Sequence, residues 1–92
     1  MHIATKKNHF KVVAKLIKLQ FPVNKPKKNG ITPVGIAAYH NNVSILKLLH
    51  TNGANINITN KNGIGPLNLA IKSSSYKSIT YLLKNGAHLY YL

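Results

Sequence analysis

Apolar residues in this chain are spaced as in short amphipathic helices, separated by turns that contain Asn and Gly. Between Val43 and Leu49 the apolar positions are 43, 45, 46, 48 and 49, a pattern typical of a helix that buries one side. The run ends at the pair Asn52-Gly53. Gly adopts the left-handed backbone conformation that closes many helices, so the pattern predicts a helix that begins at Val43 and ends near Asn52.

A shorter helix is predicted just before this one, from Pro33 through about Tyr39. The Thr32 hydroxyl can accept a hydrogen bond from the free amides of the first turn. Pro33 suits the first helical position because its missing N–H costs nothing there. The polar run 40–42 separates the two helices, and the Asn-rich residues 55–62 predict the turn that leads onward.

This helix-turn-helix pattern repeats along the chain. The segment around Gly30 recurs 33 residues later around Gly63, and residues 48–54 recur at 81–87 with the same offset. A weaker copy precedes both. A fixed period of this length is the signature of a repeat architecture. The chain is therefore interpreted as a single domain, residues 1–92, with units at approximately 1–26, 27–59 and 60–92.

These segments closely resemble the ankyrin repeat. The resemblance rests on the 33-residue period, on Gly-Ile-Thr-Pro-Val-Gly-Ile-Ala-Ala at residues 30–38, on the Leu-Leu pair at 48–49, and on Asn-Gly-Ala-Asn-Ile-Asn at 52–57. It implies an all-α solenoid of about three stacked helix-turn-helix units with projecting loops. It also implies a concave surface formed by the loop tips and the first helices. Gly65 departs from the pattern, because it stands where Thr32 caps the middle unit.

The first unit lacks the opening turn and the Thr-Pro pair of the middle unit. Repeat arrays generally need about three or more units and polar faces at both ends. We therefore expect either that this chain belongs to a longer array or that another copy covers its ends. The second case would produce self-association through the terminal units.

The charge of the chain is strongly one-sided. It contains 13 basic residues, all of them Lys, and no Asp or Glu, so the formal net charge is +13. No ion pair can form within the chain except through the C-terminal carboxylate. Such a positive field attracts acidic partners. A/T-rich codons would also enrich Lys, Asn, Ile and Tyr together, which is a second explanation of the composition.

The missing residue types exclude most catalytic chemistry. Without Cys there is no disulfide or thiolate site, and without carboxylates there is no acid pair, Ser-His-Asp triad or oxygen-ligated Mg²⁺ or Ca²⁺ site. His2 and His9 lie about two helical turns apart, too far to chelate one ion readily. We expect no enzymatic activity, cofactor or metal. We expect exposed side chains at the five histidines, His2, His9, His40, His50 and His88.

The chain shows no targeting or membrane signal. It has no run of about 18 apolar residues that could span a bilayer, and its N-terminus lacks the apolar stretch of a secretory signal. We expect an intracellular location, cytoplasmic or nuclear.

The resemblance to ankyrin repeats also implies a binding surface at the loop tips and first helices. Five of its twelve positions are Lys, and three others, Ile31, Tyr39 and Ile64, would supply apolar contact. Transferred by repeat position, the predicted surface comprises Lys6, Lys7, Lys28, Asn29, Ile31, Tyr39, His40, Lys61, Asn62, Ile64, Lys72 and Ser73.

Three roles remain open for such a surface. The first is binding of another protein, and an acidic one would be steered by the Lys side chains. The second is nonspecific binding of nucleic acid, which the high pI of about 10.3 favours. The absence of Arg disfavours it, because Arg is the side chain best suited to bind phosphates and guanine edges. The third is a structural spacer inside a larger protein.

Overall fold

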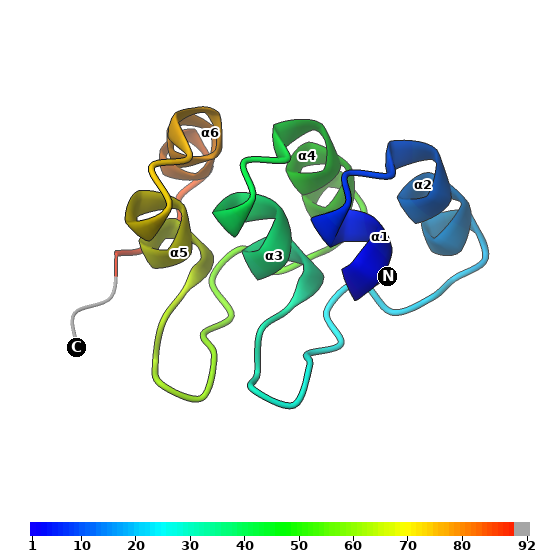
Figure 1. Cartoon of the computed structure of the whole chain (residues 1–92), viewed down its shortest axis with the longest axis horizontal. Helices are drawn as coiled ribbons and strands as arrows, with labels where there is room; N and C mark the ends of the chain where they lie inside the picture. Colours follow the sequence, from blue (N-terminus) through cyan, green and yellow to red (C-terminus); the bar gives the residue numbers. More distant parts are fainter. Residues whose placement is uncertain (90–92) are drawn as a thin grey trace.

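The computed structural model describes residues 1–89, and this part of the chain contains six helices and no strand. The helices follow one another in pairs joined by tight turns, and longer loops connect one pair to the next (Figure 1). Their bounds are α1 His2–Lys6, α2 Phe10–Lys18, α3 Pro33–Tyr39, α4 Val43–Thr51, α5 Pro66–Lys72 and α6 Tyr76–Lys84.

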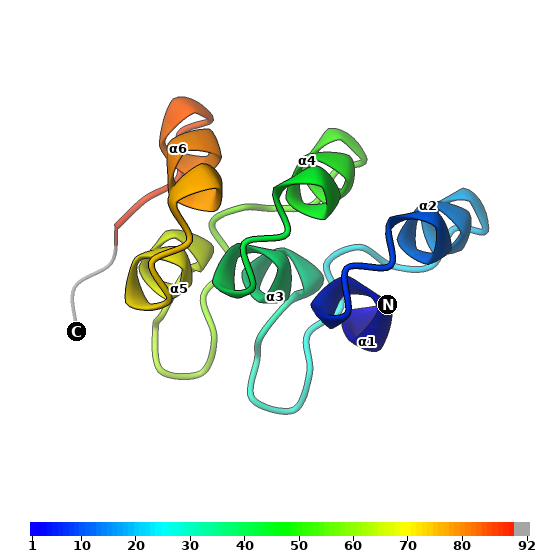
Figure 2. The ribbon, with the colours of Figure 1, turned by 45° about the horizontal axis from the view of Figure 1, so that its top comes forward.

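The helix pairs stack side by side in two rows. The first helices, α1, α3 and α5, form one row, and the second helices, α2, α4 and α6, form the other (Figures 1 and 2). The two loops that precede α3 and α5 project beyond the first row (Figure 1). The predicted all-α stack of helix-turn-helix units with projecting loops is confirmed.

The middle pair has the limits that the sequence predicts. The Thr32 hydroxyl accepts a hydrogen bond from the Gly35 amide at 3.3 Å, and Pro33 is the first helical residue. After Tyr39 the chain turns at Asn41, whose φ is 55°. The next helix ends before Gly53, whose φ of 95° requires the left-handed region that glycine adopts without strain.

The last pair begins without this cap. Gly65 precedes α5 in an extended conformation and has no side chain to offer the first amides of the helix. Pro66 still occupies the first helical position, so one of the free amides is removed rather than capped. The substitution of Gly for Thr noted in the sequence therefore costs a cap but does not change where the helix begins.

The core lies between the two rows and between neighbouring pairs. Its largest fully buried side chains are aliphatic and come mainly from the second helices. The first helices contribute small residues, because Ala4, Ala37 and Ala70 share one repeat position and are all buried. Small side chains there let adjacent helices pack closely. The largest buried aliphatic residues are Ile45, Leu46, Leu49, Leu67 and Leu82.

Polar side chains at the tight turns tie each pair to the one before it. The Asn42 amide group donates a 2.7 Å hydrogen bond to the Thr5 carbonyl. One unit later, the Ser75 hydroxyl donates a 3.0 Å hydrogen bond to the Tyr39 carbonyl. These bonds fix the offset between successive first helices, and so they shape the surface that those helices present.

Candidate functional site

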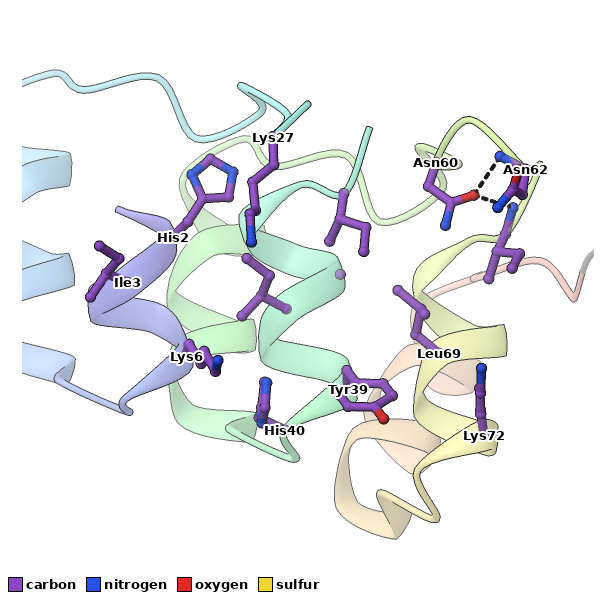
Figure 3. A pocket seen from close by; sticks show the side chains of 14 residues that line it. His2, Ile3, Lys6, Lys27, Tyr39, His40, Asn60, Asn62, Leu69 and Lys72 are labelled. Carbon is purple, nitrogen blue, oxygen red and sulfur yellow. Dashed lines mark hydrogen bonds between the residues drawn. The ribbon is translucent and has the colours of Figure 1, made fainter. Parts of the chain in front are cut away.

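A groove of about 530 Å³ runs along the first helices α1, α3 and α5 beside the projecting loops (Figure 3). We call it the central groove. It lies on the surface that the sequence predicts as the binding face. The predicted residues that line it are Lys6, Ile31, Tyr39, His40, Asn62, Ile64 and Lys72.

The floor of the central groove is largely apolar. Ile31 and Ile64 reach it from the two projecting loops, and Leu69 reaches it from α5. Gly35 of α3 lies between them without a side chain. A Cβ atom at Gly35 would lie 3.3 Å from the Cγ2 atom of Ile31 and 3.3 Å from the Cδ1 atom of Leu69. Because Gly35 has no Cβ, these two side chains can close over the α3 backbone.

Basic side chains surround this floor. Lys6 comes from α1, Lys72 from α5, and Lys27 from the loop before α3. Lys6 and Lys72 lie on opposite sides of Tyr39, while Lys27 stands near the loop end of the groove (Figure 3). The sequence contains no Asp or Glu to neutralise them. The charge of these three side chains is therefore not offset by any acidic side chain of this chain.

Aromatic and imidazole rings form one end of the groove. Tyr39 is 41% exposed, and its ring centroid lies 5.2 Å from that of the exposed His40, edge to face. Tyr side chains combine large contact area with a polar tip, which makes them frequent anchors of protein interfaces. The exposed ring of Tyr39 is thus available for the apolar contact that the sequence predicts.

The expectation that all five histidines are exposed is wrong for two of them. His2 is half-buried and lines the groove, and its Nε2 atom is buried without a hydrogen-bond partner in the described chain. Burial lowers the pKa of His2 below its ordinary value of 6.5, and the N-terminal ammonium and the Lys27 charge lower it further. His50 is also half-buried, against Tyr81.

The loop tips carry three predicted residues that lie outside the walls of the groove. Lys28, Asn29 and Lys61 are all exposed, and the two lysines extend the positive surface beyond the groove. The two tips touch, because the Lys61 amide donates a 3.2 Å hydrogen bond to the Asn29 carbonyl. A Cβ atom on Gly30 would lie only 2.9 Å from the backbone nitrogen of Lys61. The tips therefore form one connected edge of the predicted binding face.

The other predicted residues outside the groove differ in their surroundings. Lys7 is exposed at the end of α1. Ser73 is half-buried at the end of α5, where its hydroxyl contacts the Leu69 carbonyl at 3.1 Å and the Ser75 hydroxyl at 2.7 Å. The Ser73 side chain is thus engaged within its own turn.

Some groove residues were not among the predicted ones. They fall at shared repeat positions, which is the signal that could have revealed them. Ile3, Ile36 and Leu69 are each separated by 33 residues, and so are Lys27 and Asn60. The sequence prediction considered only one end of each first helix. The additional lining residues are His2, Ile3, Lys27, Gly35, Ile36, Asn60 and Leu69.

A second, smaller hollow of about 320 Å³ lies between α4 and α6. We call it the outer groove. Lys47, Lys77 and Lys84 line it together with Tyr81, and the Lys47 Nζ atom lies 5.7 Å from the centroid of the Tyr81 ring. This cluster belongs to the second helices, so the positive charge is not confined to the predicted face.

The described residues show neither a membrane helix nor a metal cluster. Within residues 1–89, no helix is long and apolar enough to cross a bilayer. In the same part of the chain, no group of three or more His, Cys, Asp or Glu side chains could hold a metal ion.

Comparison with known families identifies the class of protein. A family model described as ankyrin repeats (3 copies) matches residues 1–91. The chain therefore belongs to the ankyrin-repeat family. Ankyrin repeats are in general modules of protein–protein interaction and typically non-enzymatic scaffolds. A comparison with curated proteins finds no match.

Proposed function

We propose that this chain binds an acidic segment of another protein in the central groove. The observation that carries the proposal is the set of Lys6, Lys27 and Lys72 around an apolar floor, in a chain that has no Asp or Glu. A binding role, rather than catalysis, agrees with the general use of ankyrin repeats.

The lysines and the floor would contribute in different ways. Uncompensated ammonium groups raise the rate of encounter with an acidic partner and disfavour basic ones, but charge pairs near water add little affinity. Apolar contacts with Ile31, Ile64 and Leu69 would supply most of the stability of the complex, because burial of apolar surface is the larger favourable contribution. A partner that carries both acidic and apolar side chains fits the groove better than one that carries charge alone.

Two triple variants of equal charge test the proposal. Lys6→Ala/Lys27→Ala/Lys72→Ala removes three charges from the central groove, and Lys47→Ala/Lys77→Ala/Lys84→Ala removes three from the outer groove. The probe is a fluorescent peptide that alternates Glu with Leu, and its binding is measured by anisotropy at physiological salt. We expect the first variant to lose about tenfold or more in affinity and the second to lose little. Equal losses would show that net charge alone holds the peptide and would overturn the proposal.

Polyanion binding along the outer groove is the second candidate. The observation that favours it is the set of Lys47, Lys77 and Lys84, which brings three ammonium groups to one hollow between α4 and α6. Nonspecific phosphate binding weakens steeply with added salt. If an oligothymidylate probe binds more tightly than the peptide, loses affinity steeply with salt, and is released mainly by the outer-groove variant, this second function replaces the first.

A further inference from the structure

The centre of the binding groove departs from the two units beside it. The 33-residue offset places His2, Gly35 and Asn68 at the same position of successive first helices. Two of these residues carry polar side chains, and the middle one carries none. Glycine inside a helix is less favourable than alanine, so the missing side chain lowers the stability of α3.

The packing around Gly35 shows what its missing side chain permits. Ile31 approaches from the loop and Leu69 from α5, and each would come within 3.3 Å of a Cβ atom on Gly35. That distance is tighter than most ordinary contacts, so any side chain at this position would push one of them away. We call Ile31, Gly35 and Leu69 the apolar seat.

The apolar seat lies within the ring of lysines. All three of its residues line the central groove together with Lys6 on the α1 side and Lys72 on the α5 side. Figure 3 shows these two lysines on either side of the groove, with Leu69 between the Asn60 loop and Lys72. An extended or helical segment that crosses the seat would therefore meet positive charge before and after it.

Resting on the proposed function, we infer that one aliphatic side chain of the partner packs against the Ile31 and Leu69 side chains of the apolar seat, flanked on both sides by acidic residues. The seat determines specificity, and the lysines hold the acidic flanks. His2 does not add to this charge at neutral pH, because its burial disfavours the protonated ring. A second copy of this chain does not fit, because it carries net charge +13 and no acidic residue.

The test compares two fluorescent peptides of equal charge, one with a central Leu and one with a central Ser, each flanked by Glu residues. The wild-type chain should prefer the Leu peptide by about tenfold, as expected for burial of one aliphatic side chain. Gly35→Asn, which places in the seat the residue that the next unit carries, should erase that preference. It should lower binding of the Ser peptide much less than binding of the Leu peptide, because Lys6, Lys27 and Lys72 remain.

Three further variants make the outcome decisive. Ile31→Ala removes one wall of the seat from a loop, and it should lower the Leu preference even if Gly35→Asn does not fold. Gly35→Ala should lower the preference only in part, and helix propensity should offset its effect on stability. Ile71→Ala changes an exposed side chain of α5 that does not line the groove, and it should leave the preference intact.

Each result bears on a different claim. Equal binding of both peptides by the wild-type chain, or a preference that survives both Gly35→Asn and Ile31→Ala, would overturn the apolar seat while leaving the acidic partner in place. Failure of the wild-type chain to bind either peptide would instead overturn the proposed function.

Discussion

The Nδ1 atom of His50 lies 2.7 Å from the hydroxyl oxygen of Tyr81, so a side-chain hydrogen bond joins α4 to α6 across neighbouring units. The two rings meet edge to face at 84°, with centroids 5.7 Å apart. Burial raises the pKa of Tyr81 above its ordinary value of 10.0, which favours the protonated hydroxyl, and a phenolic hydroxyl can donate or accept in this bond. The bond couples the stability of the last helix pair to that of the middle one.

Tyr81→Phe removes this bond and keeps the ring. We expect the free energy of unfolding to fall by about 1 kcal/mol, the usual net contribution of such a bond, as measured by urea denaturation. Tyr76→Phe is the control, because Tyr76 lies on the same helix and is 73% exposed. If the two variants unfold at the same urea concentration, the bond does not couple the units.

Substitutions at Gly30 and Gly53 distinguish the cost of backbone strain from the cost of moving the two loop tips apart. Both residues have a positive φ, 84° at Gly30 and 95° at Gly53. A Cβ atom on Gly53 would meet nothing within 4 Å, whereas a Cβ atom on Gly30 would meet the backbone nitrogen of Lys61. Gly53→Ala should cost about 1 kcal/mol from the left-handed conformation alone. Gly30→Ala should cost more in thermal unfolding, because the loop tips must also move apart. Equal costs would mean that the tips do not pack against each other.

The burial of His2 predicts a dependence of stability on pH. Its pKa is lower in the folded chain than its ordinary value of 6.5, so below pH 6.5 the unfolded chain binds a proton that the folded chain resists. The contribution of His2 to the free energy of unfolding is fully present above pH 6.5, and it is lost as the pH falls from there through the pKa of His2 in the folded chain. His2→Asn should therefore weaken the fall in unfolding free energy between pH 7 and pH 5. An NMR titration in which the His2 ring titrates at or above 6.5 would contradict the account.

Exposed apolar residues at the two ends of the stack predict salt-dependent self-association. In the first unit Val12 is 48% exposed, while Ile45 at the same position of the middle unit is fully buried. In the last unit Ile71 is 47% exposed, while Ala38 at the same position of the middle unit is fully buried. Because the chains repel each other through their net charge, added salt should favour association. Sedimentation equilibrium should show larger species as salt rises, and fewer with Leu83→Ser, which removes a 60% exposed apolar side chain from α6. A monomer at every salt concentration would show that the ends do not associate.

Much of the fold follows from local signals in the sequence. Thr32, Pro33 and Gly53 mark helix limits through capping and backbone conformation, which depend only on near neighbours. The 33-residue offset then predicts the helix limits in units whose own signals are weaker. One example is the helix that follows Gly65, which has no side chain to cap it. The tertiary arrangement could be predicted from the repeat alone, because each unit packs mainly on its neighbours.

The residues that line the central groove were predictable only in part. The loop tips and Tyr39 could be placed from repeat positions, but the burial of His2 depends on contacts made by segments distant in sequence. The contact of Leu69 with the backbone at Gly35 depends on how closely α5 packs against α3, which no local pattern contains. The outer groove was missed for the same reason, because Lys47 and Lys84 meet only after α4 and α6 stack.

The most direct test of the central claim is an NMR map of the chain with the Glu-Leu peptide at physiological salt. Chemical shifts of backbone amides should change at Ile31, Tyr39 and Lys72 on the central groove as peptide is added, and those of Lys47 and Lys84 on the outer groove should stay in place. Changes centred on the outer groove, or spread evenly over all lysines, would contradict recognition by the central groove.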